Sequence, residues 1–517
     1  MESLEFWSAH ALVHWPRATA ALQVVLPDVY PLLFKMSFLE EKVDWLYEVT
    51  RTWPLPVLSL TNLLAGSSPC ASCLYAFFAG LRDHVGRSGT STDDGAKSTT
   101  SALWGSCPLH TVDLMGVQDG QKATCLCGKT LGRWGRTQAL AQACVEATMI
   151  QQRTSSPGSI QVIINAFVTK QNCNNVLTAL RAGPNAPITI SCTELRVDNL
   201  ELEQVLELVQ LIGPLERLDM VHNVRLGFNG LPALLPHCHL HTLRALSLPP
   251  RAVDVLKMGP DLEKTSLALA ALSSLAELNM PYSRLTGHVQ QLFGGMVCSL
   301  STLDFSGCGL SSADLRWLAQ APIFTGLQKL DFSSHPLGQL SPTAVYRMIR
   351  RTGPLLESLR LEDCDLGDGE MTLLLASLRG HTQLKHFSLT GNIFSSNGLK
   401  CLVSWMASHL PALQRLEYHI PPDCFPSQVE NPLNPNSTSP QQATTGQPDG
   451  VRVALLHSQL NNIVAQAGRS DLHLEAGLQG GGEIDFDMKE TWGELRSALL
   501  QSLSDSIKSY LDSLTDY

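Results

Sequence analysis

The sequence predicts an α/β fold in which short strands alternate with helices in a repeated unit. A pattern Leu-x-x-Leu-x-Leu-x-x-(Asn/Cys)-x-Leu recurs through the second half of the chain. Residues 313–318 and 373–378 are examples of the helix-forming stretches that separate the copies. The first leucines of the copies, two of which are partial, are Leu215, Leu243, Leu275, Leu300, Leu327, Leu356, Leu384 and Leu413.

The spacing of these leucines is close to the period of long leucine-rich repeats. A unit of this size cannot bury its apolar face alone, so stacked neighbours share one continuous core. We therefore expect a leucine-rich repeat solenoid, a horseshoe with ribonuclease-inhibitor-like repeats of about 28 residues. A helical module is expected to precede it.

Residues 1–66 do not follow the repeat and are predicted to form an N-terminal helical docking or capping module. Ser3 is suited to cap a helix that runs to Leu12. Leu4, Ser8 and Leu12 are spaced one turn apart, so they form a ridge on one helix face. Such a ridge can enter an apolar pocket of a partner. The alternative is that it only covers the open end of the repeat core.

The remaining chain divides by composition and period. Segments with few apolar side chains cannot offset their ordering entropy by burial, which predicts flexibility. The predicted segments are a flexible Cys/Gly/Ser-rich connection at 67–108, irregular N-terminal repeats at 109–214, regular leucine-rich repeats at 215–420, a disordered linker at 426–450 and a C-terminal helical cap or tail at 451–517. Within the last segment, residues 491–517 have the spacing of a one-faced amphipathic helix, which would cap the solenoid or bind a partner.

Composition excludes several classes of protein. The 517 residues include 37 Lys and Arg against 47 Asp and Glu, a formal charge of −10, which argues against a general nucleic-acid binder. No apolar run reaches the ~18 residues that a membrane span needs. The acidic start of the chain differs from a secretory signal, and the scattered cysteines are typical of a reducing compartment. We predict a cytoplasmic protein, with the nucleus as the alternative.

The sequence offers no clear catalytic or metal-binding motif. Five cysteines could form a zinc site or remain free thiols, and their irregular spacing favours free thiols. These are Cys70, Cys73, Cys107, Cys125 and Cys127. Gly128-Lys129-Thr130 lacks the earlier glycine of a phosphate-binding loop, and the histidines, as in His237-Cys238-His239, are interpreted as single core or surface residues. We predict no enzyme activity, no cofactor and no metal.

A binding surface is easier to argue, because strand side chains alternate between two faces. The residues between the leucines of each repeat would point away from the core, onto the concave face that such proteins use for recognition. The candidate partner-binding residues are Asp219, Asn279, Asp304, Asp331, Arg360, Ser388 and Glu417.

Several proline–aromatic motifs resemble the PRAME (preferentially expressed antigen in melanoma) family. They comprise Leu26-Pro27 with Tyr30-Pro31-Leu32-Leu33-Phe34, Thr52-Trp53-Pro54-Leu55-Pro56 and the closing Pro422-Asp423-Cys424. Together with the repeat spacing, the resemblance covers residues 1 to about 475.

The resemblance implies a substrate receptor of a cullin-2 RING ubiquitin ligase that is joined through elongin B and elongin C. The elongin-C box would start at Ser3 and Leu4 and end at Leu12, with Ser8 where the box prefers cysteine. Leu26 and Pro27 would form the adjacent cullin contact. The alternative is a stoichiometric binding protein that masks a signalling partner without recruiting a ligase. A ribonuclease-inhibitor-like binder shares the architecture only.

Overall fold

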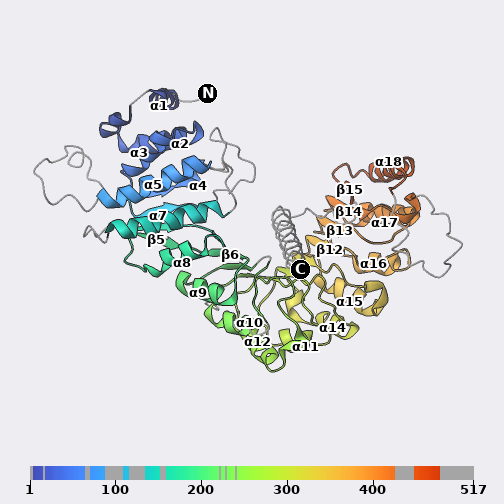
Figure 1. Cartoon of the computed structure of the whole chain (residues 1–517). Helices are drawn as coiled ribbons and strands as arrows, with labels where there is room; N and C mark the ends of the chain where they lie inside the picture. The colour runs from blue at the N-terminus through green and yellow to red at the C-terminus, as the bar shows by residue number, and fades with distance from the viewer. Residues whose placement is uncertain are drawn as a thin grey trace, which may run out of the picture. The chain divides into compact units, whose positions relative to one another are not determined.

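The computed structural model describes ten stretches of the chain, which fall in two compact units. The described stretches are residues 4–15, 18–64, 70–87, 109–115, 134–151, 159–220, 223–227, 230–238, 241–425 and 447–477. Unit 1 comprises residues 1–249 with 271–275, and unit 2 comprises 250–270 with 276–517. Each unit combines parallel strands with helices, and unit 1 begins with a run of helices (Figure 1).

Unit 1 contains the N-terminal helices and the irregular repeats. Its helices are α1 (Leu4–His14), η1 (Ala18–Gln23), η2 (Pro27–Val29), α2 (Tyr30–Leu39), α3 (Val43–Arg51), α4 (Leu60–Leu64), α5 (Ala71–Arg87), α7 (Gly135–Gln151), α8 (Cys173–Arg181), α9 (Leu202–Ile212), α10 (Gly230–Leu234) and η3 (Leu235–His237). Its strands are β1 (Val57–Ser59), β2 (Thr111–Asp113), β3 (Ile160–Ile163), β4 (Ala166–Thr169), β5 (Ile188–Ser191), β6 (Glu194–Asp198), β7 (Arg217–Met220) and β8 (Ala245–Ser247). They form two parallel series, β1-β2-β3-β5 and β4-β6-β7-β8.

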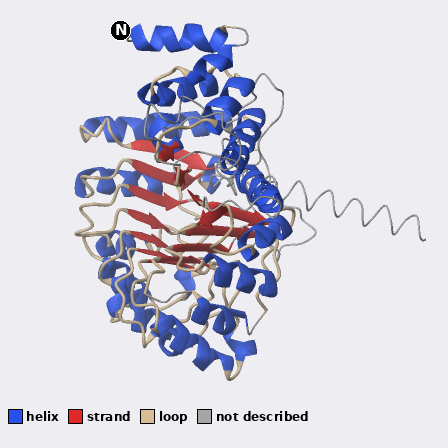
Figure 2. Ribbon diagram, turned by 90° about the vertical axis from the view of Figure 1, so that its left-hand side faces the viewer, coloured by secondary structure: helices blue, strands red, loops and turns tan. Residues whose placement is uncertain are grey.

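Unit 2 contains the regular repeats. Its strands are β9 (Glu277–Asn279), β10 (Thr302–Asp304), β11 (Lys329–Asp331), β12 (Ser358–Arg360), β13 (His386–Leu389), β14 (Arg415–His419) and β15 (His473–Gly477). Its helices are α11 (Val255–Met258), α12 (Asp261–Ala270), α13 (Val289–Phe293), α14 (Ser312–Leu318), η4 (Pro322–Phe324), η5 (Leu337–Gln339), α15 (Pro342–Thr352), α16 (Met371–Ser377), α17 (Ser396–His409), η6 (Pro422–Cys424) and α18 (Gly450–Gln466). Strands β9 to β15 are neighbours in this order. Strands of the chain, drawn red in Figure 2, lie one above another.

The strand register confirms the leucine-rich repeat prediction. In unit 2, Leu303 pairs with Leu278 on one side and with Leu330 on the other, and all three are buried. The same position continues as Leu359, Phe387 and Leu416, so each strand adds one apolar side chain to a common core. The parallel pairing places residues one repeat period apart at the same level of the sheet.

Polar side chains at the turn after each strand join neighbouring repeats. Asn392 is buried, and its amide nitrogen donates to the carbonyls of Leu361 at 2.7 Å and Leu389 at 2.9 Å. Its amide oxygen accepts from the backbone nitrogens of Cys364 and Leu366, both at 3.1 Å. These four bonds satisfy backbone groups that would otherwise be buried without partners. These hydrogen bonds explain why the sequence pattern has asparagine at this position.

The prediction of a flexible connection at 67–108 was wrong for its first part, where Ala71–Arg87 forms helix α5. This helix packs on α3 and α7 and buries Phe77, Phe78 and Leu81. The two helices α3 and α5 can approach closely at Gly80 because glycine has no Cβ. A Cβ at this position would lie only 2.6 Å from the Tyr47 carbonyl oxygen. Residues 88–108 lie outside the described stretches.

The repeat series also extends beyond the predicted limits of 109 and 420. Strand β1 already pairs in parallel with β2, so a strand stands within the segment predicted as a helical module. At the other end, the segment predicted to be a helical cap contains α18 and then β15, which pairs in parallel with β14. Leu474 follows its strand partner Leu416 along the chain by about two repeat periods. The amphipathic segment 491–517 and residues 426–446 of the predicted linker are not among the described residues.

Candidate partner-binding surfaces

Helix α1 has one buried side and one exposed side. Ala9 and Val13, one turn apart, are buried against α2, whereas Ser8 and Ala11 are exposed. Leu12 is half-buried at the border of the two sides. With about 100° between successive helical residues, Leu4 and Ser8 lie on the side turned away from Ala9 and Val13. Ser3 and the side chain of Leu4 lie outside the described part.

Large apolar side chains are exposed around this helix. Trp15 is 69% exposed, Val24 82% and Leu26 50%, and Trp7 is exposed as well. Single exposed apolar residues are common on protein surfaces, but here several of them fall within a short part of the sequence between Trp7 and Leu26.

The two residues of the expected cullin contact begin η2. Leu26 precedes the helix with an extended backbone, and Pro27 occupies its first turn, where a missing N–H costs nothing. The following Tyr30 is buried, and its hydroxyl donates to the Leu22 carbonyl at 3.2 Å. The edge of its ring meets Trp53. Tyr30 is therefore a buried structural residue just after η2.

In unit 2 the strand register brings six of the seven predicted partner-binding residues together. They occupy the same position of successive strands, so each lies beside the next. We call this set the charged column; from β9 to β14 it consists of Asn279, Asp304, Asp331, Arg360, Ser388 and Glu417. The seventh residue, Asp219, lies on β7 in unit 1, where it accepts a hydrogen bond from Ser247 at 2.9 Å.

Two carboxylates stand side by side in the charged column. The Asp304 carboxylate accepts the Ser306 N–H at 2.8 Å, and the Asp331 carboxylate accepts the Ser333 N–H at 3.0 Å. Burial raises the pKa of Asp331 to about 6, and the adjacent charge of Asp304 adds to this rise. Burial also raises the pKa of Asp304. Both carboxyls therefore gain from a positive charge placed over them.

The arginines in and beside the column are already engaged in ion pairs. Arg360 lies 3.4 Å from Asp331 and 2.8 Å from Glu362. Burial alone would lower the pKa of Arg360, but these carboxylates outweigh it and raise the pKa. Beside the column, Arg415 lies 2.9 Å from Glu417 and 2.6 Å from Glu475. The charged column thus carries positive and negative side chains that are held in place by ion pairs, and the carboxylates of Asp304 and Asp331 make one part of it acidic.

The cysteines considered as zinc ligands are only partly described. Cys70 and Cys73 are buried at the start of α5, where the Cys73 N–H points to the Cys70 sulfur at 3.3 Å. Burial raises the pKa of the Cys73 thiol. Cys107, Cys125 and Cys127 lie outside the described residues, as do Gly128-Lys129-Thr130.

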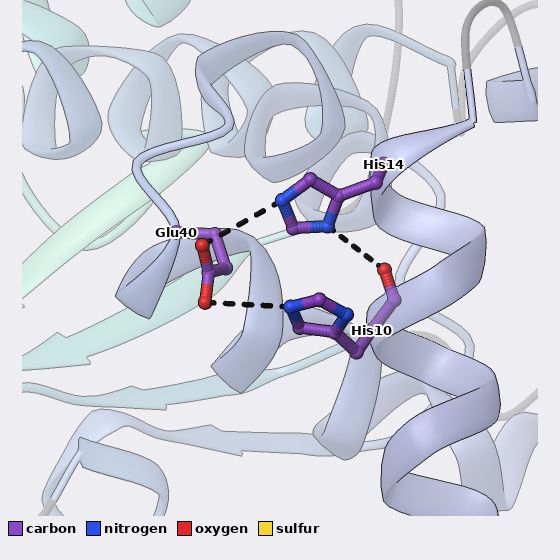
Figure 3. Close-up of side chains that lie close together, drawn as sticks. All are labelled: His10, His14 and Glu40. Carbon is purple, nitrogen blue, oxygen red and sulfur yellow. Dashed lines mark hydrogen bonds and ion pairs between the residues drawn. The ribbon is translucent and has the colours of Figure 1, made fainter.

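One side-chain cluster was missed in the sequence. His10 and His14 of α1 converge on Glu40, which follows α2, and the donor atoms of all three lie within 4.8 Å of one another (Figure 3). The His-x-x-x-His spacing was visible, since residues four apart share a helix face. Glu40 was not, because only the packing of α1 on α2 brings it near.

The model of the PRAME C-terminal domain matches residues 161–429, which is more than half of the chain. The chain belongs to the PRAME family. Leucine-rich repeat-containing protein 14 of Xenopus laevis is 28% identical over 91% of this chain and 97% of its own. The human protein of that name is 27% identical over 94% of this chain and 99% of its own.

Two solved structures show distant likeness to this PRAME-family chain. Rad7 in its yeast complex with Elc1 has a TM-score of 0.38 and 14% identity, covering 74% of this chain and 90% of that chain. LegL7 of Legionella pneumophila has a TM-score of 0.34 and 15% identity, covering 63% and 95%.

The PRAME family and the leucine-rich repeat fold indicate a protein-interaction scaffold. Modules of this kind are typically non-catalytic, and their partners are proteins. Among the described residues, no helix is both long and apolar enough to cross a membrane.

Proposed function

We propose that the chain is a substrate receptor of a cullin-2/elongin BC ubiquitin ligase. The face of α1 that includes Leu4, Ser8 and Leu12 binds elongin C, and Leu26 with Pro27 contacts cullin-2. The charged column binds the protein substrate. The scaffold acts by holding the substrate near a ubiquitin-charged enzyme, which raises their effective concentration.

The exposed side of α1 is the observation that carries the proposal. A helix that served only as a cap would turn its largest apolar residues inward, but here the smaller Ala9 and Val13 are buried, while Trp7 on α1 and Trp15 just after it are exposed. Ser8 lies at the centre of the outward side, and its small side chain allows this side of the helix to enter an apolar pocket of a partner. Ser8 of the elongin-C box pattern lies on this exposed side, and Leu12 lies at its border.

Purified full-length chain and elongin BC test the first contact. Ser8→Arg places a long charged side chain on the exposed ridge without touching the buried side, so elongin C recovery should fall at least about tenfold. Ser404→Arg is the matched control, because Ser404 is also an exposed helical serine but lies on α17 in unit 2. Equal loss in both variants would show that the loss does not come from the ridge on α1.

Leu26→Asp tests the second contact separately. This variant should still recover elongin BC and lose cullin-2, since Leu26 follows α1 and is half exposed. If the wild-type chain recovers neither elongin C nor cullin-2, the ligase proposal fails. The stoichiometric binding protein that masks a signalling partner would then replace it.

Substrates are tested in cells by protein abundance. Proteins that decline when the wild-type chain is expressed should recover with Ser8→Arg and also with Asp331→Arg. The first variant removes the ligase and the second reverses the charge of the column. If the two variants rescue different sets of proteins, the charged column is not the substrate surface.

A further inference from the structure

The cluster of His10, His14 and Glu40 joins two elements of unit 1. Nε2 of His10 lies 3.8 Å from one carboxylate oxygen of Glu40, and Nε2 of His14 lies 3.6 Å from the other. The two imidazole rings are 4.4 Å apart between centroids and tilted by 31° (Figure 3). Three metal-binding side chains therefore converge on one point between α1 and the end of α2.

The hydrogen bond of His14 decides which nitrogen faces Glu40. Nδ1 of His14 lies 2.9 Å from the backbone carbonyl oxygen of His10, and because a carbonyl only accepts, Nδ1 carries the proton. A neutral His14 then directs the lone pair of Nε2 at the Glu40 carboxylate. Two electron-rich groups in that arrangement repel each other, and either a second proton on His14 or a cation between them removes the repulsion. A backbone bond on the second ring nitrogen is the arrangement that orients metal-bound histidine.

The donor set selects the kind of cation. Two imidazoles and one carboxylate suit Zn²⁺ and related transition metals, whereas Mg²⁺ and Ca²⁺ prefer oxygen ligands alone. Bonds of about 2.0–2.2 Å require the ligand atoms to lie roughly 3.4 Å apart, whereas here they lie within 4.8 Å of one another. The three side chains are 36%, 37% and 38% exposed, so rotation about their own bonds brings them together.

We propose that His10, His14 and Glu40 form a Zn²⁺ site that fastens α1 to α2. Nε2 of each histidine and one oxygen of Glu40 supply three ligands, and water supplies the fourth. The contact between the two helices otherwise includes the small buried side chains of Ala9 and Val13. The metal thus adds three directional bonds to this junction.

The site and the proposed elongin ridge occupy different sides of α1. His10 and His14 lie about 120–160° around the helix from Ser8. A bound metal leaves the ridge open and fixes the direction in which it points. Zinc binding is therefore independent of the proposed function and can be tested without any partner.

Metal titration of the full-length chain, kept reduced, tests the site. Co²⁺ serves as the probe, because its visible absorption reports tetrahedral ligation, and Zn²⁺ should displace it. His10→Gln and Glu40→Gln should each weaken one Co²⁺ equivalent at least about tenfold. His409→Gln is the control, since His409 stacks on Trp405 four residues before it and not on a second histidine. Mg²⁺ at the same concentration should not displace Co²⁺.

Hydrogen exchange of residues 4–14 provides a second measurement, which does not depend on the other thiols and histidines of the chain. Zn²⁺ should slow exchange in this segment of the wild type and of His409→Gln, but not in His10→Gln. Equal Co²⁺ affinity in wild type and Glu40→Gln would overturn the proposal, and so would exchange that Zn²⁺ leaves unchanged in the wild type. The cluster would then be an ion pair only.

Discussion

At the scale of single residues, the ionised carboxylate of Asp331 lowers the stability of the folded chain but suits the binding of a cation. Asp331 keeps a side chain that is 21% exposed beside a second carboxyl group, and its pKa is raised to about 6. A raised pKa means that the folded chain prefers the neutral form, so the ionised form costs stability. A cation supplied by a partner would remove this cost. The residue is thus better explained as part of a recognition surface than as part of the core.

Asp331→Asn should stabilise the chain at pH 7.5. The stabilising contribution of a carboxyl with a raised pKa is complete below the unfolded pKa of about 3.9 and is lost as pH rises through about 6. The asparagine should raise the free energy of unfolding by about 1 kcal/mol at pH 7.5, after allowance for solvent and Arg360, and change it little at pH 4.5. Melting temperatures at both pH values measure this, with the exposed Glu216→Gln as control. A loss of stability at both pH values would show that the Arg360 ion pair dominates.

At the scale of single elements, the turn after each strand decides how firmly repeats are joined. Asn392 makes four hydrogen bonds to the turn after β12 and to the end of β13. The equivalent Cys364 directs its thiol to the carbonyls of Phe332 at 3.5 Å and Glu362 at 3.3 Å. Thiol hydrogen bonds are weak, so the repeats are not equally secured. Repeats with asparagine at this position are therefore joined by stronger hydrogen bonds than repeats with cysteine.

Asn392→Ala should lower the free energy of unfolding of unit 2 by about 3 kcal/mol, because it leaves four buried backbone groups unpaired at about 1 kcal/mol each, partly relieved by water. Asn397→Ala, an exposed asparagine on the next helix, is the matched control and should cost under about 0.5 kcal/mol. Urea unfolding measures both, and hydrogen exchange should show faster exchange at Cys364 and Leu366 in the first variant. Similar urea midpoints for the two variants would contradict the role given to Asn392.

The sequence predicted the elements where one local signal repeats and missed those that depend on a distant neighbour. The leucine spacing located β7 to β14, since each copy carries its own buried positions. It did not reveal α5, whose close approach at Gly80 depends on α3, a helix from an earlier part of the chain. Nor did it reveal the meeting of His10 and His14 with Glu40. Six of the seven candidate partner-binding residues share one position of neighbouring strands, because parallel pairing converts a sequence period into spatial neighbours, and their role in binding stays a prediction.

At the scale of the whole molecule, the repeat series continues within the described residues as far as β15. Strand β14 would present an open edge of backbone groups if β15 did not pair with it. The sequence hid this last strand because residues 426–446 interrupt the period and because no side chain of β15 itself is fully buried. The C-terminal part described up to residue 477 is thus a further repeat.

Arg469 holds this last repeat in place. Its guanidinium donates to the carbonyls of Leu410 and Leu413, at the end of α17 and before β14, and it pairs with Asp471 at 2.9 Å. Arg469→Met keeps the apolar stem but leaves these carbonyls unpaired, so unfolding should become easier by about 3 kcal/mol at the rate of charged hydrogen bonds. As β15 detaches, exchange should accelerate at 473–477 and then in β14, and the exposed edge should cause concentration-dependent association. Arg452→Met on exposed α18 is the control, and Arg469→Lys should recover part of the loss. If hydrogen exchange in β14 is equally fast in the Arg469→Met and Arg452→Met variants, apolar contacts rather than Arg469 hold β15 in place.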